Sequence, residues 1–310
     1  MVKMASGVYP APRRRLWRRE TVAGYLFILP WAVGFLVFSA GPLLMSIAVM
    51  GTDWQLLTPP RWVGLANLAH LTQDPLFWTV VGNTVYIVGI SVPLYLCAAF
   101  GAALLLNAPL RLISVYRVVF YLPSQVPVVA NALLWLWIFN PQFGLANAVL
   151  AFFHVPPQLW FLDAAWAKPC LIIMGLWGIG TGMVIFLASL QGVPESLHEA
   201  AMLDGASTFQ RFWNVTVPMV SPVILFQLVI GIIGTFQAGF AYVYIITQGG
   251  PNNSTTLWIL YIYQKGFEDF QMGYAATLSW ALFLVVLVFT VVQFKLANRW
   301  VYYEDSTEGP

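Results

Sequence analysis

Long uncharged stretches alternate with short polar segments along this chain of 310 residues. The uncharged stretches cover residues 21–52, 75–110, 118–162, 169–194, 212–264 and 270–294. Each is long enough for a helix that crosses the hydrocarbon core of a bilayer, which needs about 20 mostly apolar residues. The pattern therefore predicts an all-α membrane protein with six transmembrane helices, the first over residues 23–50.

A polar segment, residues 192–222, lies around the junction of the fourth and fifth stretches and contains residues typical of helix starts and ends. A helix is predicted from about residue 195 to Gly205, because glycine readily adopts the left-handed conformation that ends many helices. Ser207 and Gln210 have the spacing of a capping box, in which two side chains satisfy free backbone N–H groups at a helix start. We expect a second helix from this point, and we expect Pro218 to stop it or to kink it into the next span.

Composition agrees with a membrane protein and excludes several other classes. The chain is 60% hydrophobic and 8% charged, whereas soluble domains carry about 25% charged residues. Its net charge of +2, without basic clusters interleaved with aromatic residues, indicates no nucleic-acid partner. Cys97 and Cys170 lie in apolar stretches, and His70, His154 and His198 are isolated, so we predict no disulfide and no metal site.

The basic residues predict how the chain is oriented. Residues 1–20 form a segment rich in arginine, and six crossings place both termini on one side of the membrane. With that side inside, all lysines and arginines except Arg61, Lys168 and Lys265 lie on the inner side, as the positive-inside rule requires. We therefore predict a cytoplasmic segment 1–20, a six-helix membrane domain 21–303 and a cytoplasmic tail 304–310.

The predicted spans contain no Asp, Glu, Lys or Arg in their interior. A proton-driven transporter usually keeps an ionisable residue at membrane depth, so the driving force is expected to come from elsewhere. The chain also has no G-x-x-x-x-G-K-[ST] segment to hold ATP and no Ser/His/Asp or paired-carboxylate constellation. We predict no catalytic residue, no cofactor and no enzymatic activity in this chain.

Residues 199–206 read Glu-Ala-Ala-Met-Leu-Asp-Gly-Ala, and Val-Thr-Val-Pro follows up to Pro218. This pattern resembles the EAA loop of ATP-binding-cassette (ABC) importer permeases. In that family the loop is a cytoplasmic coupling helix that sits in a groove of the ATPase subunit. The resemblance implies that loop 192–218 couples to an ATPase through Glu199, Ala200, Ala201, Asp204 and Gly205, with Glu199 paired to a basic residue of the groove. The alternative is an ordinary helical hairpin between two spans.

Two shorter segments point to carbohydrate importers. Residues 62–67 resemble a Gly-Leu-x-Asn stretch that follows the first span in sugar-importer permeases, and residues 249–255 resemble their Gly-Gly-Pro-x-Asn-Ser-Thr element. The resemblance implies the type I ABC importer permease architecture in a bacterial plasma (inner) membrane. It also implies a second permease forming a heterodimer, an ATPase dimer that binds ATP and Mg, and an extracytoplasmic solute-binding protein that delivers a sugar.

Uncharged spans fit a neutral sugar or polyol better than an anion. Sugar sites pair aromatic faces with amide and hydroxyl groups, and such residues are available inside the predicted spans. The candidates for the substrate path are Asn131, Trp135, Gln237 and Tyr242. Each can instead serve helix packing. An importer permease for glycerol-phosphate or another small solute, a stand-alone secondary transporter and a structural membrane protein remain alternatives.

Overall fold

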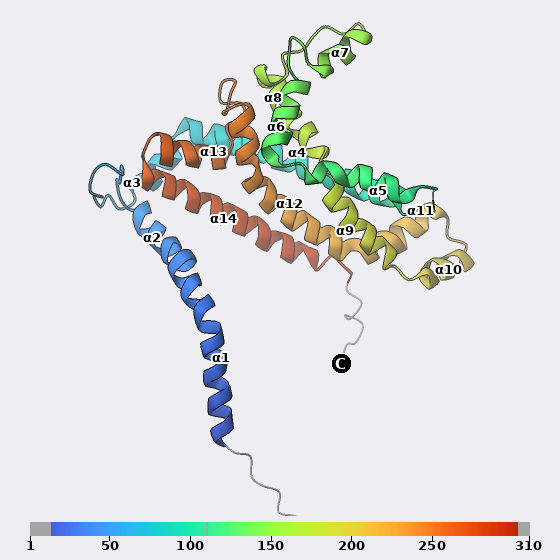
Figure 1. Cartoon of the computed structure of the whole chain (residues 1–310), viewed down its shortest axis with the longest axis horizontal. Helices are drawn as coiled ribbons and strands as arrows, with labels where there is room; N and C mark the ends of the chain where they lie inside the picture. The colour runs from blue at the N-terminus through green and yellow to red at the C-terminus, as the bar shows by residue number, and fades with distance from the viewer. Residues whose placement is uncertain (1–13, 110, 303–310) are drawn as a thin grey trace, which may run out of the picture.

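The computed structural model describes residues 14–109 and 111–302 (Figure 1). Most of the predicted basic segment and the whole tail 304–310 lie outside these residues. The described part is helical, without strands, and Thr52 and Trp62 form one isolated antiparallel bridge there. Its helices are α1 Arg14–Phe35, α2 Gly41–Met50, α3 Ala66–Gln73, α4 Pro75–Leu106, α5 Ile113–Tyr121, α6 Val128–Ile138, α7 Leu145–Phe152, α8 Ala164–Leu176, α9 Gly180–Gln191, α10 Glu195–Leu203, α11 Thr208–Arg211, α12 Val217–Ile246, α13 Trp258–Tyr263 and α14 Met272–Ala297.

The described helices account for the six predicted crossings. Four continuous helical segments are long and apolar enough to span a bilayer: Thr21–Met50, Pro75–Leu106, Thr208–Ile246 and Met272–Ala297. Two further crossings are bent pairs. Ile113–Gln125 and Val128–Ile138 meet at 98°, and Ala164–Leu176 and Gly180–Gln191 meet at 47°. Counting each pair as one span gives six.

The first bend has a local cause. Pro123 and Pro127 lie in and beside the connecting 3₁₀ turn Leu122–Gln125, and their rings remove two backbone donors that a straight helix would use.

The prediction that the spans lack charged residues is wrong at four positions. Arg117 lies within α5 and Lys168 within α8, and the long segments Thr208–Ile246 and Met272–Ala297 include Arg211 and Lys295. The charge-free stretch 169–194 placed the fourth span after Lys168. The helix instead begins one turn earlier, because the Asp163 carboxylate accepts a hydrogen bond from the Ala165 N–H at 2.8 Å and caps it.

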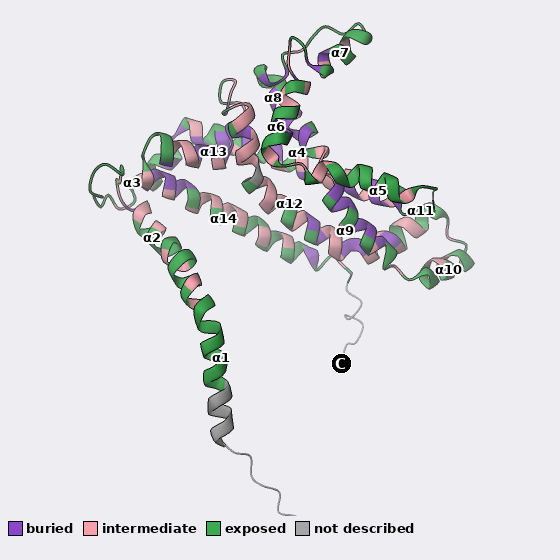
Figure 2. Ribbon diagram, in the orientation of Figure 1, coloured by how far each residue is buried: buried purple, intermediate pink, exposed green. Residues whose placement is uncertain are grey.

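α4 runs through the middle of the bundle and packs against α8, α9 and α12 (Figure 1). Its small residues Ala99, Ala102 and Ala103 are buried against Met183 and Phe186 of α9, and small side chains let two membrane helices approach closely. α1 projects away from this bundle, and Figure 2 shows it as exposed where its side chains are described. Two ends of the bundle can be distinguished, and we call them the α13 end and the α10 end.

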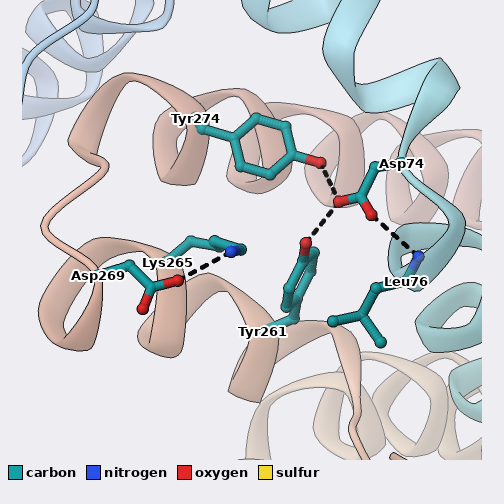
Figure 3. Close-up of polar contacts among 6 residues, drawn as sticks. All are labelled: Asp74, Leu76, Tyr261, Lys265, Asp269 and Tyr274. Atoms are coloured by element: carbon teal, nitrogen blue, oxygen red, sulfur yellow. Dashed lines mark hydrogen bonds and ion pairs between the residues drawn. The ribbon is translucent and has the colours of Figure 1, made fainter.

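A buried carboxylate joins three elements at the α13 end (Figure 3). Asp74 is 9% exposed and caps α4, because its Oδ1 accepts a hydrogen bond from the Leu76 N–H at 2.9 Å. Its Oδ2 accepts hydrogen bonds from the hydroxyls of Tyr261 on α13 at 2.5 Å and Tyr274 on α14 at 2.6 Å. We call these three residues the Asp74 clasp.

The Gly-Gly-Pro-Asn-Asn-Ser-Thr segment is a bonded turn at the same end. The Thr255 hydroxyl, fully buried, lies 2.7 Å from both the Thr247 hydroxyl and the Gly250 carbonyl. The Asn83 amide of α4 donates to the carbonyls of Asn253 at 2.7 Å and Thr256 at 3.2 Å. The segment therefore fastens the end of α12 to the start of α4.

Candidate functional site

The hairpin α10–α11 is built as the sequence predicts. α10 ends at Gly205, whose φ of +79° is left-handed. The Gly205 N–H bonds to the Met202 carbonyl at 3.0 Å and the Ala206 N–H to the Ala201 carbonyl at 2.9 Å, which together form a Schellman motif. The next helix begins with the predicted capping box of Ser207 and Gln210.

Of the two outcomes expected at Pro218, the structure does not show a stop, and the helix continues into the next span. A π-helical turn, Phe212–Thr216, leads from α11 into α12, and the helix continues over 39 residues as Thr208–Ile246. Pro222, inside α12, cannot donate to the Pro218 carbonyl. The buried Ser221 hydroxyl donates to that carbonyl instead, at 2.6 Å, and it also accepts from the Tyr302 N–H at 2.9 Å.

The hairpin presents an unpartnered surface at the α10 end (Figure 1). Of the five residues predicted to couple to an ATPase, all are exposed except Ala201, which is half-buried. Large apolar side chains are exposed beside them, among them Leu203 at 89% and Phe209 at 72%. Contiguous exposed apolar groups on a structured hairpin are typical of a docking surface.

A cavity of about 510 Å³ opens between α4, α8, α9 and α12, within the usual size range of small-ligand sites. We call it the central cavity. Its lining is mostly apolar with scattered hydroxyl and amide groups. The polar side chains that line it are Ser91, Tyr95, Thr181, Gln227, Thr235 and Tyr242.

Two of these polar side chains form hydrogen bonds with the backbone of one glycine, Gly182. The Tyr95 hydroxyl accepts a hydrogen bond from the Gly182 N–H at 3.1 Å, and the Gln227 amide donates to the Gly182 carbonyl at 3.1 Å. A Cβ at Gly182 would approach the Tyr95 hydroxyl to 2.8 Å, so this contact needs glycine. The Ser91 hydroxyl is buried without a partner among the described residues, which leaves it available to a ligand.

Three of the four predicted path residues lie near one another. The Asn131 amide on α6 donates to the Tyr242 hydroxyl on α12 at 3.4 Å, and Tyr242 lines the central cavity. Trp135 lies one turn along α6 from Asn131 and stacks on Phe139 at 5.3 Å. The Trp135 indole N–H and the side-chain amide oxygen Oδ1 of Asn131 are buried without a hydrogen-bond partner within the described part of the chain.

Gln237 lies apart from this group. It is exposed on α12, at helical spacing from Phe240 and Tyr244, whose rings stack at 5.3 Å. Tyr263, which follows on α13, packs edge-on against Tyr244 at 5.3 Å. Gln237 therefore belongs to an aromatic face of α12 rather than to the central cavity.

Comparison with known proteins identifies the family. The family described as binding-protein-dependent transport system inner membrane component matches residues 95–302. The chain belongs to this family. It is thus a multi-pass membrane component of a transport system.

Relatives match along almost the whole chain. It is 38% identical to "Probable ABC transporter permease protein YesP" of Bacillus subtilis (strain 168), over 98% of this chain and 99% of the relative. It is 36% identical to "Lactose transport system permease protein LacF" of Rhizobium radiobacter, over 93% and 98%.

A solved bacterial alginate ABC transporter, in complex with alginate pentasaccharide-bound periplasmic protein, contains a chain of the same fold. The TM-score is 0.82, over 92% of this chain and 98% of that chain, at 22% identity. The permease fold predicted from the sequence is therefore confirmed.

Reasoning from the sequence did not single out Ser91, Tyr95 and Gln227 in this permease. A polar residue in an otherwise apolar span can indicate a functional residue. Gln227 fits this pattern, because the residues on both sides of it are apolar. Ser91 and Tyr95 gave no such signal, since serine and tyrosine are common in membrane helices.

Proposed function

We propose that the chain is the permease subunit of a bacterial ABC importer for carbohydrates. Together with a second permease, it would form the path for a sugar delivered by an extracytoplasmic solute-binding protein. The names of relatives support this substrate class, since they include permeases for lactose, for trehalose/maltose and for arabinooligosaccharides.

One observation carries the proposal: a single continuous helix, Thr208–Ile246, joins the exposed hairpin to the central cavity. A displacement imposed on the hairpin reaches the cavity wall without passing through a flexible loop. ATP-driven closure of an ATPase dimer, which would bind ATP and Mg, would switch the path between outward and inward access through this helix. The α10 end and both termini would then be cytoplasmic, in agreement with the positive-inside rule.

Glu199, Ala200, Ala201, Asp204 and Gly205 would make the ATPase contact in this proposal. Glu199 is exposed and would pair with a basic residue of the ATPase groove. The two alanines would keep the contact close, since larger side chains hold the helix away. Gly205 supplies the bend that presents α10.

Asn131, Trp135 and Tyr242 would contact the sugar in the path. The free amide oxygen of Asn131 and the indole N–H of Trp135 can bind sugar hydroxyls. The rings of Trp135 and Tyr242 can stack on a sugar face. Gln237 would offer an amide beside the aromatic face formed by Phe240 and Tyr244.

Co-purification with ATPase activity tests the proposal. The tagged chain, isolated from native membranes, is expected to recover an ATPase and a second permease. Glu199→Lys should weaken recovery of the ATPase and reduce solute transport per ATP hydrolysed. Glu195→Lys makes the same charge change on the same exposed helix and serves as the matched control. Recovery of the chain alone, with solute flux in vesicles that lack an ATPase, would instead establish a stand-alone transporter.

A glycerol-phosphate importer is the second candidate, because the chain is 31% identical to "sn-glycerol-3-phosphate transport system permease protein UgpA" of Yersinia pestis bv. Antiqua (strain Antiqua). Competition binding to the partner solute-binding protein separates the two. Displacement of a bound sugar by glycerol 3-phosphate but not by other sugars would favour this candidate.

A further inference from the structure

Lys168 is a half-buried cation without a carboxylate partner in the described part of the chain. It lies on α8, and its Nζ donates to Asn83 Oδ1 on α4 at 3.1 Å. The same ammonium lies over the ring of Tyr86, 4.9 Å from its centroid. These contacts use part of its hydrogen-bonding capacity, since an ammonium carries three donors.

The acidic residues on neighbouring elements have other partners. Asp163, which starts α8, caps that helix through the Ala165 N–H. Asp74, which starts α4, accepts from two tyrosines and one backbone N–H in the Asp74 clasp. A partly desolvated ammonium without an opposite charge is costly.

Asn83 fixes the position of this ammonium. Both amide hydrogen bonds of Asn83 go to backbone carbonyls of the 249–256 turn, so its side-chain oxygen is left facing α8. The Lys168 ammonium is thus held at a defined point, whereas a lysine at a lipid-facing helix end is usually free to move.

The location connects Lys168 to the central cavity. Leu171 lines the cavity one turn along α8 from Lys168, and Ile87 lines it one turn along α4 from Asn83. Lys168 and Asn83 therefore each lie one helical turn from a residue that lines the cavity. The α13 end would face outward in the proposed function, where a solute enters.

We infer that Lys168 binds the anionic group of the transported solute, which would be a saccharide or polyol bearing one carboxylate or phosphate. The inference rests on the proposed function and narrows its substrate class. An ammonium held by the Asn83 amide oxygen and the Tyr86 ring, without a carboxylate partner among the described residues, matches such a solute, because charge-assisted hydrogen bonds are among the strongest a binding site can make.

Uptake by the complete importer tests this inference. The chain is reconstituted in proteoliposomes with its second permease, ATPase and solute-binding protein. Four probes are compared: digalacturonate, its neutral methyl ester, lactose and glycerol 3-phosphate. Lys168→Gln removes the charge while keeping a donor for Asn83, and Lys168→Arg keeps the charge. Lys265→Gln is the control, since Lys265 is paired with Asp269 at 2.8 Å on the same end.

Lys168→Gln is expected to raise KM for the transported anionic probe by about tenfold or more, the loss typical of one charge-assisted hydrogen bond. KM for a neutral probe, kcat and the amount of assembled complex should stay unchanged. Lys168→Arg should retain most of the affinity, and Lys265→Gln should behave as wild type. If Lys168→Gln raises KM for digalacturonate, the group that Lys168 binds is a carboxylate. If it raises KM for glycerol 3-phosphate, that group is a phosphate.

Three results would count against these ideas, and they can be told apart. Uptake of only neutral probes overturns the inference. Equal loss of uptake for neutral and anionic probes in Lys168→Gln also overturns it, because Lys168 would then only anchor α8 to α4. An assembled complex that takes up glycerol 3-phosphate but no saccharide would instead contradict the carbohydrate importer of the proposed function.

Discussion

Removing the Asp74 carboxylate should be among the most damaging single changes at the α13 end. In Asp74→Ala the hydroxyls of Tyr261 and Tyr274 remain buried without an acceptor, and α4 loses its cap. Each stranded hydroxyl costs about 1–3 kcal/mol and the cap about 1 kcal/mol, so the free energy of unfolding should fall by about 3–7 kcal/mol. Tyr274→Phe removes one bond to a charged acceptor and should cost about 1.5–3 kcal/mol.

A double-mutant cycle measures this coupling directly. Free energies of unfolding come from denaturing-detergent titrations of the wild type, Asp74→Ala, Tyr274→Phe and the double variant. Once Asp74 is absent, Tyr274→Phe should recover the about 1–3 kcal/mol that the stranded hydroxyl costs, so the coupling energy should be about 2.5–6 kcal/mol. Additive effects of the two substitutions would refute the Asp74 clasp as a source of stability.

The same clasp gives stability a defined pH dependence. Burial would raise the pKa of Asp74, but hydrogen bonds from Tyr261, Tyr274 and the N–H groups of Phe77 and Leu76 outweigh it and hold the pKa below 3.8. Burial and the neighbouring carboxylate raise the pKa of Tyr261, which therefore stays protonated and donates.

The unfolded state thus binds the proton more tightly, so the contribution of Asp74 is complete above the unfolded pKa of about 3.9 and is lost as pH falls through the folded pKa. The stability difference between wild type and Asp74→Ala should be constant from about pH 5 to 8 and shrink below about pH 4.

Two further predictions concern glycines. No atom lies within 4 Å of a Cβ at Gly205, so only the left-handed backbone opposes substitution. Gly205→Ala should disfavour the bend by about 1–2 kcal/mol and weaken ATPase recovery about 5- to 30-fold, whereas Gly205→Asn should be milder; equal effects would contradict the backbone argument. A Cβ at Gly273 would lie 1.8 Å from the Thr52 carbonyl oxygen, so Gly273→Ala should lower the thermal midpoint, while Gly101→Ala, which meets nothing within 4 Å, should not.

The sequence predicts the hairpin α10–α11 well because its determinants are local. A left-handed glycine and a capping box each depend on fewer than six consecutive residues, and both are present as predicted at Gly205 and Ser207. Pro222 shows the limit of local rules. A helix can continue through a proline when the freed carbonyl finds another donor, and here the Ser221 hydroxyl donates to the Pro218 carbonyl that Pro222 leaves free.

The fourth span and the cavity were harder to predict for a different reason. A charge-free stretch ends at the nearest charged residue, so it places Lys168 in a loop outside the fourth span. The helix that contains Lys168 in fact begins earlier, where Asp163 caps it. The central cavity depends on which helices adjoin, and Ser91 and Gln227 come from helices that are far apart in the chain. Neither periodicity nor spacing encodes that adjacency.

The continuous helix Thr208–Ile246 can be treated as a rod with one joint. At 1.5 Å per residue its 39 residues extend about 58 Å, so a tilt of about 5° about its midpoint displaces each end by about 2.5 Å. The weakest point is where two prolines interrupt the backbone ladder, close to the hairpin. Ser221 bridges that point and also holds the backbone of Tyr302. The hydroxyl of one serine thus replaces a backbone hydrogen bond that proline removes near the hairpin end of the rod.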